Sequence, residues 1–261
     1  MKAKEKKSPI KAPPLRNPGQ SLDEEIDRLI NDKGSQYAII IVVPIMLAAL
    51  EWYRSLTGAT LNPLVFTIIA VICAMWGLYK LSQLRPRVRA LKQGRDGEKA
   101  VGQYLEQLRV HGYRVFHDIV GDSFNIDHVI ICTKGVFTVE TKTYSKPARG
   151  EAVIRHQTNS IIIDGFDSGS DILVQAKAEA NWLGTLLNEM SGKKWQVKPV
   201  VVFPGWYIDS RTAGNDVRVL NPKALPTYID NSPVCLTQDD VSLLAYSLSR
   251  HVRNDERASS K

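Results

Sequence analysis

Two carboxylates and a lysine follow one another along a short apolar stretch in the middle of the chain. Residues 125–142 read NIDHVIICTKGVFTVETK. Side chains alternate along a strand, so Glu140 and Lys142 are predicted to share one face. A two-residue turn at 133–134 would place Asp127 opposite Glu140. Charged side chains among apolar strands cost free energy unless they are paired or bind an ion, and paired carboxylates suit a divalent metal.

Each of these residues also has a plainer interpretation. Glu140 and Lys142 are compatible with an ion pair on a strand face, and Asp127 with a residue at a strand end. The register of the hairpin decides between a metal site and these plainer interpretations, because a shift of one residue would move Asp127 to the opposite face.

Two further polar residues lie on predicted helices. Glu98 precedes an amphipathic pattern in GRDGEKAVGQYLEQLRV and lies three residues before Val101, on the inward face. Its alternative role is a carboxylate favoured by the helix N-terminus. Gln175 belongs to a predicted helix that begins at Asp171 and runs to about Met190, and its alternative is an exposed helix position.

The charge of the chain is unevenly distributed. The net charge is +7 over 261 residues. Residues 1–95 hold 15 Lys and Arg against 7 Asp and Glu, whereas residues 96–261 hold 19 against 20. The positive excess therefore lies in the N-terminal third, and overall basicity is no evidence for a nucleic-acid surface in the remainder.

The cysteines and histidines show no pattern of ligands or nucleophiles. The three cysteines are far apart and lack CxxC spacing, which predicts free thiols in a reducing compartment. His128 alternates away from Asp127, so we expect it to be structural. The other histidines considered are scattered, namely His111, His117 and His156.

The N-terminal third is predicted to anchor the chain in a membrane. Two apolar runs are long enough to cross a hydrocarbon layer, which needs roughly 20 helical residues. The expected segments are a disordered basic arm (1–20), an amphipathic helix (21–36), two transmembrane helices within 37–84 (about 37–56 and 63–80) and a basic juxtamembrane linker (85–95).

The alternatives for these runs are a buried core hairpin and a signal peptide. A core hairpin would need polar stripes, which neither run has, and a signal peptide seldom begins so far from the start. Basic residues flank both runs on the outside of the hairpin, which predicts an integral membrane protein with both termini and the following domain in the cytoplasm. The same basic flanks suit anionic lipid headgroups of the bilayer.

The remainder of the chain has the pattern of an α/β domain. We expect this domain at 96–205, an extension of the same domain at 206–252 and a disordered tail at 253–261. The predicted elements after the first helix are strands at 113–120, 125–132, 135–142, within 151–165, at 197–203 and at 217–220, and helices at 171–190 and 241–252.

Three segments together resemble the nuclease-related domain (NERD) family of the PD-(D/E)xK nuclease-like superfamily. They are GRDGEKAV, NIDHVIICTKGVFTVETK and the Gln175 region DILVQAKAEANWL. The resemblance covers roughly residues 94–203 and implies a restriction-endonuclease-like mixed central sheet flanked by helices, here preceded by the transmembrane hairpin. Ile126 stands where the superfamily motif has proline.

The resemblance also implies a function and a site. It implies a membrane-anchored, metal-dependent nuclease that hydrolyses phosphodiester bonds at the cytoplasmic face with Mg²⁺, for which Mn²⁺ can substitute. Asp127 and Glu140 correspond to the metal-binding pair, and Glu98 to a further acidic ligand. Lys142 corresponds to the motif lysine and Gln175 to a catalytic polar residue on the following helix.

Partners follow from the same resemblance. Nucleic acid, with DNA ahead of RNA, is the expected substrate, and a homodimer is one state that this fold allows. Lys146, Arg149 and Arg155 are placed to contact phosphates, or else form an ordinary solvated loop. Two other functions stay open: a catalytically inactive, membrane-tethered nucleic-acid-binding or scaffolding module, and a hydrolase of a non-nucleic phosphate.

Overall fold

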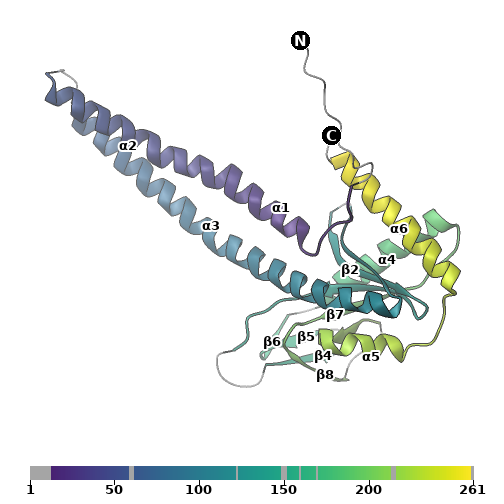
Figure 1. Cartoon of the computed structure of the whole chain (residues 1–261). Coiled ribbons are helices and arrows are strands. Elements are labelled where there is room, and N and C mark those ends of the chain that lie inside the picture. Colours follow the sequence, from purple (N-terminus) through teal and green to yellow (C-terminus); the bar gives the residue numbers. More distant parts are fainter. Residues whose placement is uncertain are drawn as a thin grey trace, which may run out of the picture. The chain divides into compact units, whose positions relative to one another are not determined.

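The computed structural model describes residues 13–58, 62–121, 123–147, 152–158, 160–168, 170–212 and 216–259 (Figure 1). The chain divides into two compact units. One comprises residues 21–93, and the other comprises residues 94–261 with the segment that precedes Ser21.

The unit of residues 21–93 is a helical hairpin. Its elements are α1 (Gln20–Arg28), a π-helical stretch (Leu29–Gly34), α2 (Ser35–Leu56) and the larger part of α3 (Pro63–Glu106). Trp52 Nε1 donates a hydrogen bond to Thr67 Oγ1 at 3.0 Å. A Cβ on Gly77 would lie 2.5 Å from Ile41 Cγ1, so glycine lets α2 and α3 approach closely at this point.

By length and composition, both helices are long and apolar enough to cross a membrane. The core helix of a soluble protein and a signal sequence pass the same test. Many of their large apolar side chains are exposed: Leu47, Ile68 and Met75 are 50%, 60% and 61% accessible. An exposed apolar surface of this extent marks a region that contacts another apolar phase or a partner.

The expected linker at 85–95 is helical instead. α3 continues through it without a break, although Pro86 lies inside the helix. Arginine, leucine, lysine and alanine dominate this stretch and are strong helix formers, so the charge that we interpreted as a linker belongs to a solvated helix. The predicted amphipathic helix likewise passes through the π-helical stretch directly into α2.

The second unit has a mixed central sheet of strand order β1-β2-β3-β7-β9 in the part of the chain that the structure describes. β1 to β3 are antiparallel neighbours, whereas β3, β7 and β9 are parallel. The bounds are β1 (Arg114–Val120), β2 (Asn125–Cys132), β3 (Gly135–Thr141), β7 (Val197–Val202) and β9 (Arg218–Leu220).

Helices cover both faces of this sheet (Figure 1). The end of α3 and α5 (Leu225–Asp230) bury Leu105 and Ile229 against one face. On the other face, α4 (Asp171–Ser191) and α6 (Gln238–Ser259) bury Leu183 and Leu244. This mixed α/β architecture, with its sheet flanked by helices, agrees with the coarse fold class predicted from the sequence.

A smaller sheet lies in the connection between β3 and β7 and extends to β8. Its strand order is β6-β5-β4-β8, with bounds β4 (Val153–Gln157), β5 (Ile161–Ile163), β6 (Phe166–Asp167) and β8 (Tyr207–Thr212). Ile154 and Ile161 pack with Trp206 and with Ile172 at the start of α4. This small core fixes the position at which α4 begins.

Two segments were expected to be disordered, at 1–20 and 253–261. The parts of them that the structure describes, 13–20 and 253–259, are ordered. Arg16 is only 9% exposed, and its Nε donates to Asp118 Oδ2 at 2.7 Å. Its guanidinium also pairs with Glu256 on α6, which extends into the expected tail. Residues 1–12 and 260–261 of the two predicted disordered segments lie outside the described residues. Arg16 thus joins the segment of residues 13–20 to β1 and α6.

Gly97 allows α3 to lie directly against the loop that follows β3. A Cβ on Gly97 would lie 1.7 Å from Thr143 Oγ1 and 2.8 Å from Thr143 Cβ. Such distances are far inside van der Waals contact, so only glycine fits. The neighbouring residues on the two elements are Glu98 and Lys142, and their approach depends on this contact.

We therefore expect Gly97→Ala to lower the melting temperature of the full-length chain. Overpacking costs about 1–3 kcal/mol, which exceeds the ~1 kcal/mol that alanine gains over glycine inside a helix. Thermal unfolding followed by circular dichroism measures the difference.

Gly184→Ala is the matched control, because a Cβ at this position in α4 would meet its neighbours at ordinary distances of 3.6 and 3.7 Å. It should leave the melting temperature unchanged or raise it. Adding Thr143→Gly to Gly97→Ala removes the atoms that clash and should restore stability. Equal melting temperatures for Gly97→Ala and the parent chain would contradict the close packing of α3.

Candidate functional site

The hairpin of β2 and β3 has the register predicted from the sequence. The turn comprises residues 133–134, and the ladder runs from the pair Cys132–Gly135 to the pair His128–Val139. One position further, Asp127 Oδ2 accepts a hydrogen bond from the backbone N–H of Thr141 at 2.7 Å. This bond fixes the Asp127 carboxylate beside Glu140 at the open end of the hairpin.

A hydrogen-bonded group of three side chains joins β3 to α4. Lys142 Nζ lies 2.7 Å from Glu140 Oε1 and donates to Gln175 Oε1 at 2.9 Å. Gln175 Nε2 donates in turn to Glu140 Oε1 at 2.9 Å. The amide of Gln175 is thereby oriented with its oxygen toward the ammonium and its nitrogen toward the carboxylate.

Glu179 is a further member of the site that the sequence interpretation did not include. Its Oε1 accepts a hydrogen bond from Gln175 Nε2 at 2.8 Å, and its side chain is 1% exposed. Gln175 and Glu179 are four residues apart and therefore lie on one flank of α4. The available signal was a glutamate at a position in the apolar repeat of this helix, between Ala176 and Leu183.

Glu98 reaches the same region from the helix on the other side. It is 8% exposed in α3. Burial raises the pKa of Glu98 to about 8, with further increases from the charges of Asp118 and Glu140. The structure therefore brings together all five predicted site residues, namely Glu98, Asp127, Glu140, Lys142 and Gln175.

Asp118, whose charge acts on Glu98, is a second residue near the site that the sequence interpretation did not include. It is 2% exposed, pairs with Arg16 and has a left-handed backbone with φ of 51°. That backbone region is uncommon for a residue other than glycine, although aspartate tolerates it better than most. A charged residue in the apolar run of β1 was the only hint, and its partner Arg16 lies 102 positions earlier in the chain.

The acidic cluster comprises Glu98, Asp127, Glu140 and Glu179, and it contains more negative charge than its lysine balances. Burial and Glu140 raise the pKa of Asp127 well above its ordinary value. Burial and Glu140 also raise the pKa of Glu179 to about 8. Burial alone would lower the pKa of Lys142, but the adjacent Glu140 raises it. Protons or a cation must therefore neutralise part of the cluster.

The donor set of this cluster is that of a hard cation site. Glu140 Oε2 and Glu179 Oε2 are buried and have no hydrogen-bond donor among the described residues. Carboxylate oxygens are the ligands that Mg²⁺ prefers. Within the described ranges, however, no three acidic, histidine or cysteine side chains already stand in a metal-binding arrangement. The chemistry fits a divalent cation, and its binding requires movement of side chains.

Two of the three predicted phosphate-contacting residues lie within the described residues, and both are exposed. Lys146 is exposed and lies against Gly205, with its Nζ 3.2 Å from the position that a Cβ there would take. Arg155 is exposed on β4 in the smaller sheet. Arg149 lies outside the described residues.

Two buried histidines, His117 and His128, form a separate group on the α3 face of the central sheet. His117 Nδ1 and His128 Nδ1 are 2.9 Å apart, and His117 Nε2 lies 2.7 Å from Glu106 Oε1. Burial lowers the pKa of both imidazoles. This group links β1, β2 and α3, in agreement with the structural role expected for His128.

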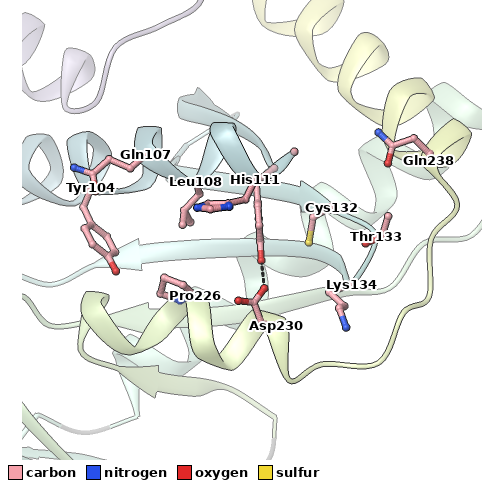
Figure 2. Close-up of a pocket in the computed structure, with 12 residues that line it drawn as sticks. Tyr104, Gln107, Leu108, His111, Cys132, Thr133, Lys134, Pro226, Asp230 and Gln238 are labelled. Carbon is pink, nitrogen blue, oxygen red and sulfur yellow. Dashed lines mark hydrogen bonds between the residues drawn. The ribbon is translucent and has the colours of Figure 1, made fainter.

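The pocket in Figure 2 is distinct from the acidic cluster. Its volume is about 520 Å³, and Tyr104, Cys132 and Asp230 contribute to its wall. Tyr113 and Asp230 are joined by a hydrogen bond across it. None of the cluster carboxylates lines this pocket, so the candidate chemistry does not depend on it.

Comparison with known proteins places the cluster within a defined family domain. The model of the nuclease-related domain family (NERD) matches residues 93–204. This match of residues 93–204 to the family model confirms the resemblance stated from the sequence motifs. All residues of the acidic cluster and its lysine lie within the matched segment.

Two individual proteins are also similar to parts of the chain. An uncharacterised protein of Bacillus anthracis is 42% identical over 57 residues, which are 20% of this chain and 27% of the relative. The chain therefore matches about a quarter of that relative's length. The structure of Pyrococcus furiosus SfsA in complex with Ca²⁺ has 17% identity and a TM-score of 0.22, covering 62% of this chain and 53% of that chain. So low a score supports no argument.

The raised pKa values predict how stability depends on pH in the absence of divalent cations. Glu98 and Glu179 have a pKa of about 8 in the folded chain against an ordinary 4.5. Between these values the folded chain retains protons that the unfolded chain has lost. The contribution of these two groups to the free energy of unfolding should therefore fall as pH rises from about 4.5 to about 8, and level off above.

Glu179→Gln tests this dependence directly in buffer with EDTA. The substitution removes the buried charge and keeps an Oε1 that accepts from Gln175, so it should raise the free energy of unfolding at pH 9 by at least about 1 kcal/mol. Glu189→Gln, at an exposed position of the same helix, is the matched control and should change little. Chemical denaturation at pH 5 and pH 9 provides the measurement. Equal effects of the two substitutions at pH 9 would contradict the uncompensated cluster.

Proposed function

We propose that the protein is a membrane-anchored, metal-dependent nuclease that hydrolyses phosphodiester bonds of nucleic acid at the cytoplasmic face. One observation carries the proposal: within the nuclease-related segment, Lys142 pairs with the buried carboxylate of Glu140, and the buried carboxylates of Asp127 and Glu179 are close enough for their charges to act on it. The surplus negative charge of the buried carboxylates suits an Mg²⁺ ion, and the adjacent ammonium of Lys142 suits the negatively charged phosphodiester.

The carboxylates of Asp127, Glu140 and Glu98 would hold the cation, with Mn²⁺ as a substitute. The buried Oε2 of Glu140, which has no donor among the described residues, supports this assignment. When bound, Mg²⁺ would supply positive charge against the negative charge that develops on the phosphodiester.

Lys142 would act on the substrate side of the site. Its side chain is 23% exposed, whereas that of Glu140 is 5% exposed. The ammonium can therefore meet a phosphate oxygen or an attacking water while it remains bound to Gln175 Oε1. Gln175 would hold the lysine in place and orient Glu140 at the same time. Its role is positioning unless it contacts substrate directly.

The restriction-endonuclease-like assignment of the fold is part of the proposal. The antiparallel hairpin of β2 and β3, followed by the parallel strand β7 with α4 in the connection, supports it. The acidic residues stand at the carboxyl end of β3, where this kind of sheet commonly places a site.

The membrane anchor is supported by α2 and α3. Their apolar side chains are exposed over much of both helices, and basic residues flank the apolar runs. An excess of Lys and Arg on the outer flanks favours both termini in the cytoplasm.

An inactive binding or scaffolding module is the second candidate. Lys142 is already paired with Glu140 at 2.7 Å, and the described residues contain no preformed three-ligand metal group. These two observations favour a site in which Lys142 occupies the place of a cation, so that the fold is kept without turnover.

Cleavage assays separate the two candidates. Full-length chain purified in a neutral detergent should cleave DNA or RNA only with Mg²⁺ or Mn²⁺. Lys142→Ala should lower kcat by about 10²–10⁴-fold, the range for a positioned proton donor or acceptor, and Gln175→Ala by about 10–100-fold, as for residues that orient ligands.

Lys223→Ala removes an exposed lysine outside the site and should retain full activity. Asp127→Asn should abolish metal-dependent cleavage while the melting temperature stays near that of the parent chain. If no nucleic acid is cleaved with either metal and Asp127→Asn changes neither metal affinity nor activity, the scaffold candidate is correct.

A further inference from the structure

A basic groove lies on the flank of α4 that faces away from the acidic cluster. It has a volume of about 1090 Å³ and is bounded by α4, β7, β9 and α5. We call it the α4–β9 groove. Its charged lining residues are Lys177, Lys194, Lys198, Arg218 and Asp216.

The geometry of α4 separates the groove from the cluster. With about 100° per residue, Lys177, Asn181 and Asn188 lie roughly 200–240° around the helix from Gln175. Ala176, Ala180 and Leu183, which are buried, lie between these two directions and face the sheet. One flank of α4 therefore completes the acidic cluster toward β3, and the other forms the wall of the groove toward β9.

The groove is positively charged and its cations are held in place. Arg218 lies over the ring of Tyr228 at 5.4 Å, and Lys198 Nζ lies 5.2 Å from the ring centroid of Phe137. Lys177 pairs with Asp216 at 2.9 Å. Across the described ranges, no carboxylate lies within ion-pair distance of Lys194, Lys198 or Arg218. No carboxylate therefore neutralises these three cations, although Lys198 Nζ also donates a hydrogen bond to the backbone carbonyl of Lys134 at 3.2 Å.

The other lining groups suit nucleotides. Asn181 and Gln196 are exposed and offer amide donors and acceptors, and Trp195 and Tyr228 contribute partly exposed aromatic rings. Positive charge along a recess with aromatic side chains is the usual form of a surface for single-stranded nucleic acid. Lipid headgroups, by contrast, are bound mainly by basic segments next to the bilayer.

We propose that the α4–β9 groove binds the phosphate backbone of a single-stranded nucleic acid, at a site separate from that of cleavage. Lys198 and Arg218 contact phosphates from the floor formed by β7 and β9. A strand bound there is held next to α4, the helix whose opposite flank carries Gln175 and Glu179.

Binding of a fluorescent oligodeoxythymidylate to the full-length chain tests the proposal by anisotropy. EDTA is present so that cleavage does not interfere. Lys198→Gln with Arg218→Gln removes two cations and keeps the first methylene groups of each side chain. Each phosphate contact on a single strand contributes about 0.7 to the slope of log K against log salt, so the slope should become shallower by about 1.4. Binding should weaken on the order of tenfold at physiological salt.

Arg114→Gln with Arg250→Gln is the matched control, because it removes the same charge from exposed positions on β1 and α6. Its salt slope should equal that of the parent chain. An unchanged slope for the Lys198 and Arg218 variant, with folding verified by circular dichroism, overturns the proposal. So does loss of binding to phosphatidylserine micelles with unchanged oligonucleotide binding, which would assign the groove to lipid headgroups.

The result of the oligonucleotide-binding test does not depend on whether the protein cleaves nucleic acid. Asp127→Asn should keep the salt slope of the parent chain, because Asp127 is not part of the groove. A groove-dependent slope in a chain that cleaves nothing would support the groove and reject the nuclease. Cleavage that requires Asp127, without a groove-dependent slope, would reject the groove alone.

Discussion

The Gln175 carboxamide connects the two elements on which the candidate site depends. Its oxygen accepts from Lys142 at 2.9 Å, and its nitrogen donates to Glu140 at 2.9 Å and to Glu179 at 2.8 Å. These bonds join the end of β3 to α4. The position of α4 over the sheet, which the smaller sheet and the apolar core determine, therefore sets the geometry of the polar groups.

Burial gives this arrangement its chemical consequence. A buried carboxylate is stable only when a proton, a cation or hydrogen bonds compensate its charge. Lys142 compensates part of the cluster, and the raised pKa values of Glu98 and Glu179 show that more compensation is needed. A divalent cation would provide it at neutral pH. The same imbalance that destabilises the free chain thus favours binding of the ion.

The sequence was sufficient for the hairpin because its constraints are local. The two-residue turn and the alternation of strand side chains together determined that Asp127 lies beside Glu140. Glu179 was missed because a single glutamate in an apolar helical repeat resembles a tolerated exception. Its role depends on Gln175 and on how α4 packs.

Ion pairs between residues far apart in the chain could not be predicted from local sequence patterns. Arg16 lies in a stretch whose composition is that of a disordered arm, and its partners are 102 and 240 positions away. Residues 85–95, expected as a basic juxtamembrane linker, are part of α3, because most of them are strong helix formers. The predicted contacts of Lys146 and Arg155 with phosphate stay predictions.

The central claim is that the acidic cluster is a cation site, and a crystal structure of the full-length chain with Mn²⁺ tests it most directly. Anomalous scattering identifies the ion without ambiguity. The account predicts an ion within about 2.3 Å of carboxylate oxygens of both Asp127 and Glu140, close to the distances of hard divalent cations. A cluster with no ion at saturating Mn²⁺, in which Lys142 still pairs with Glu140, would contradict it.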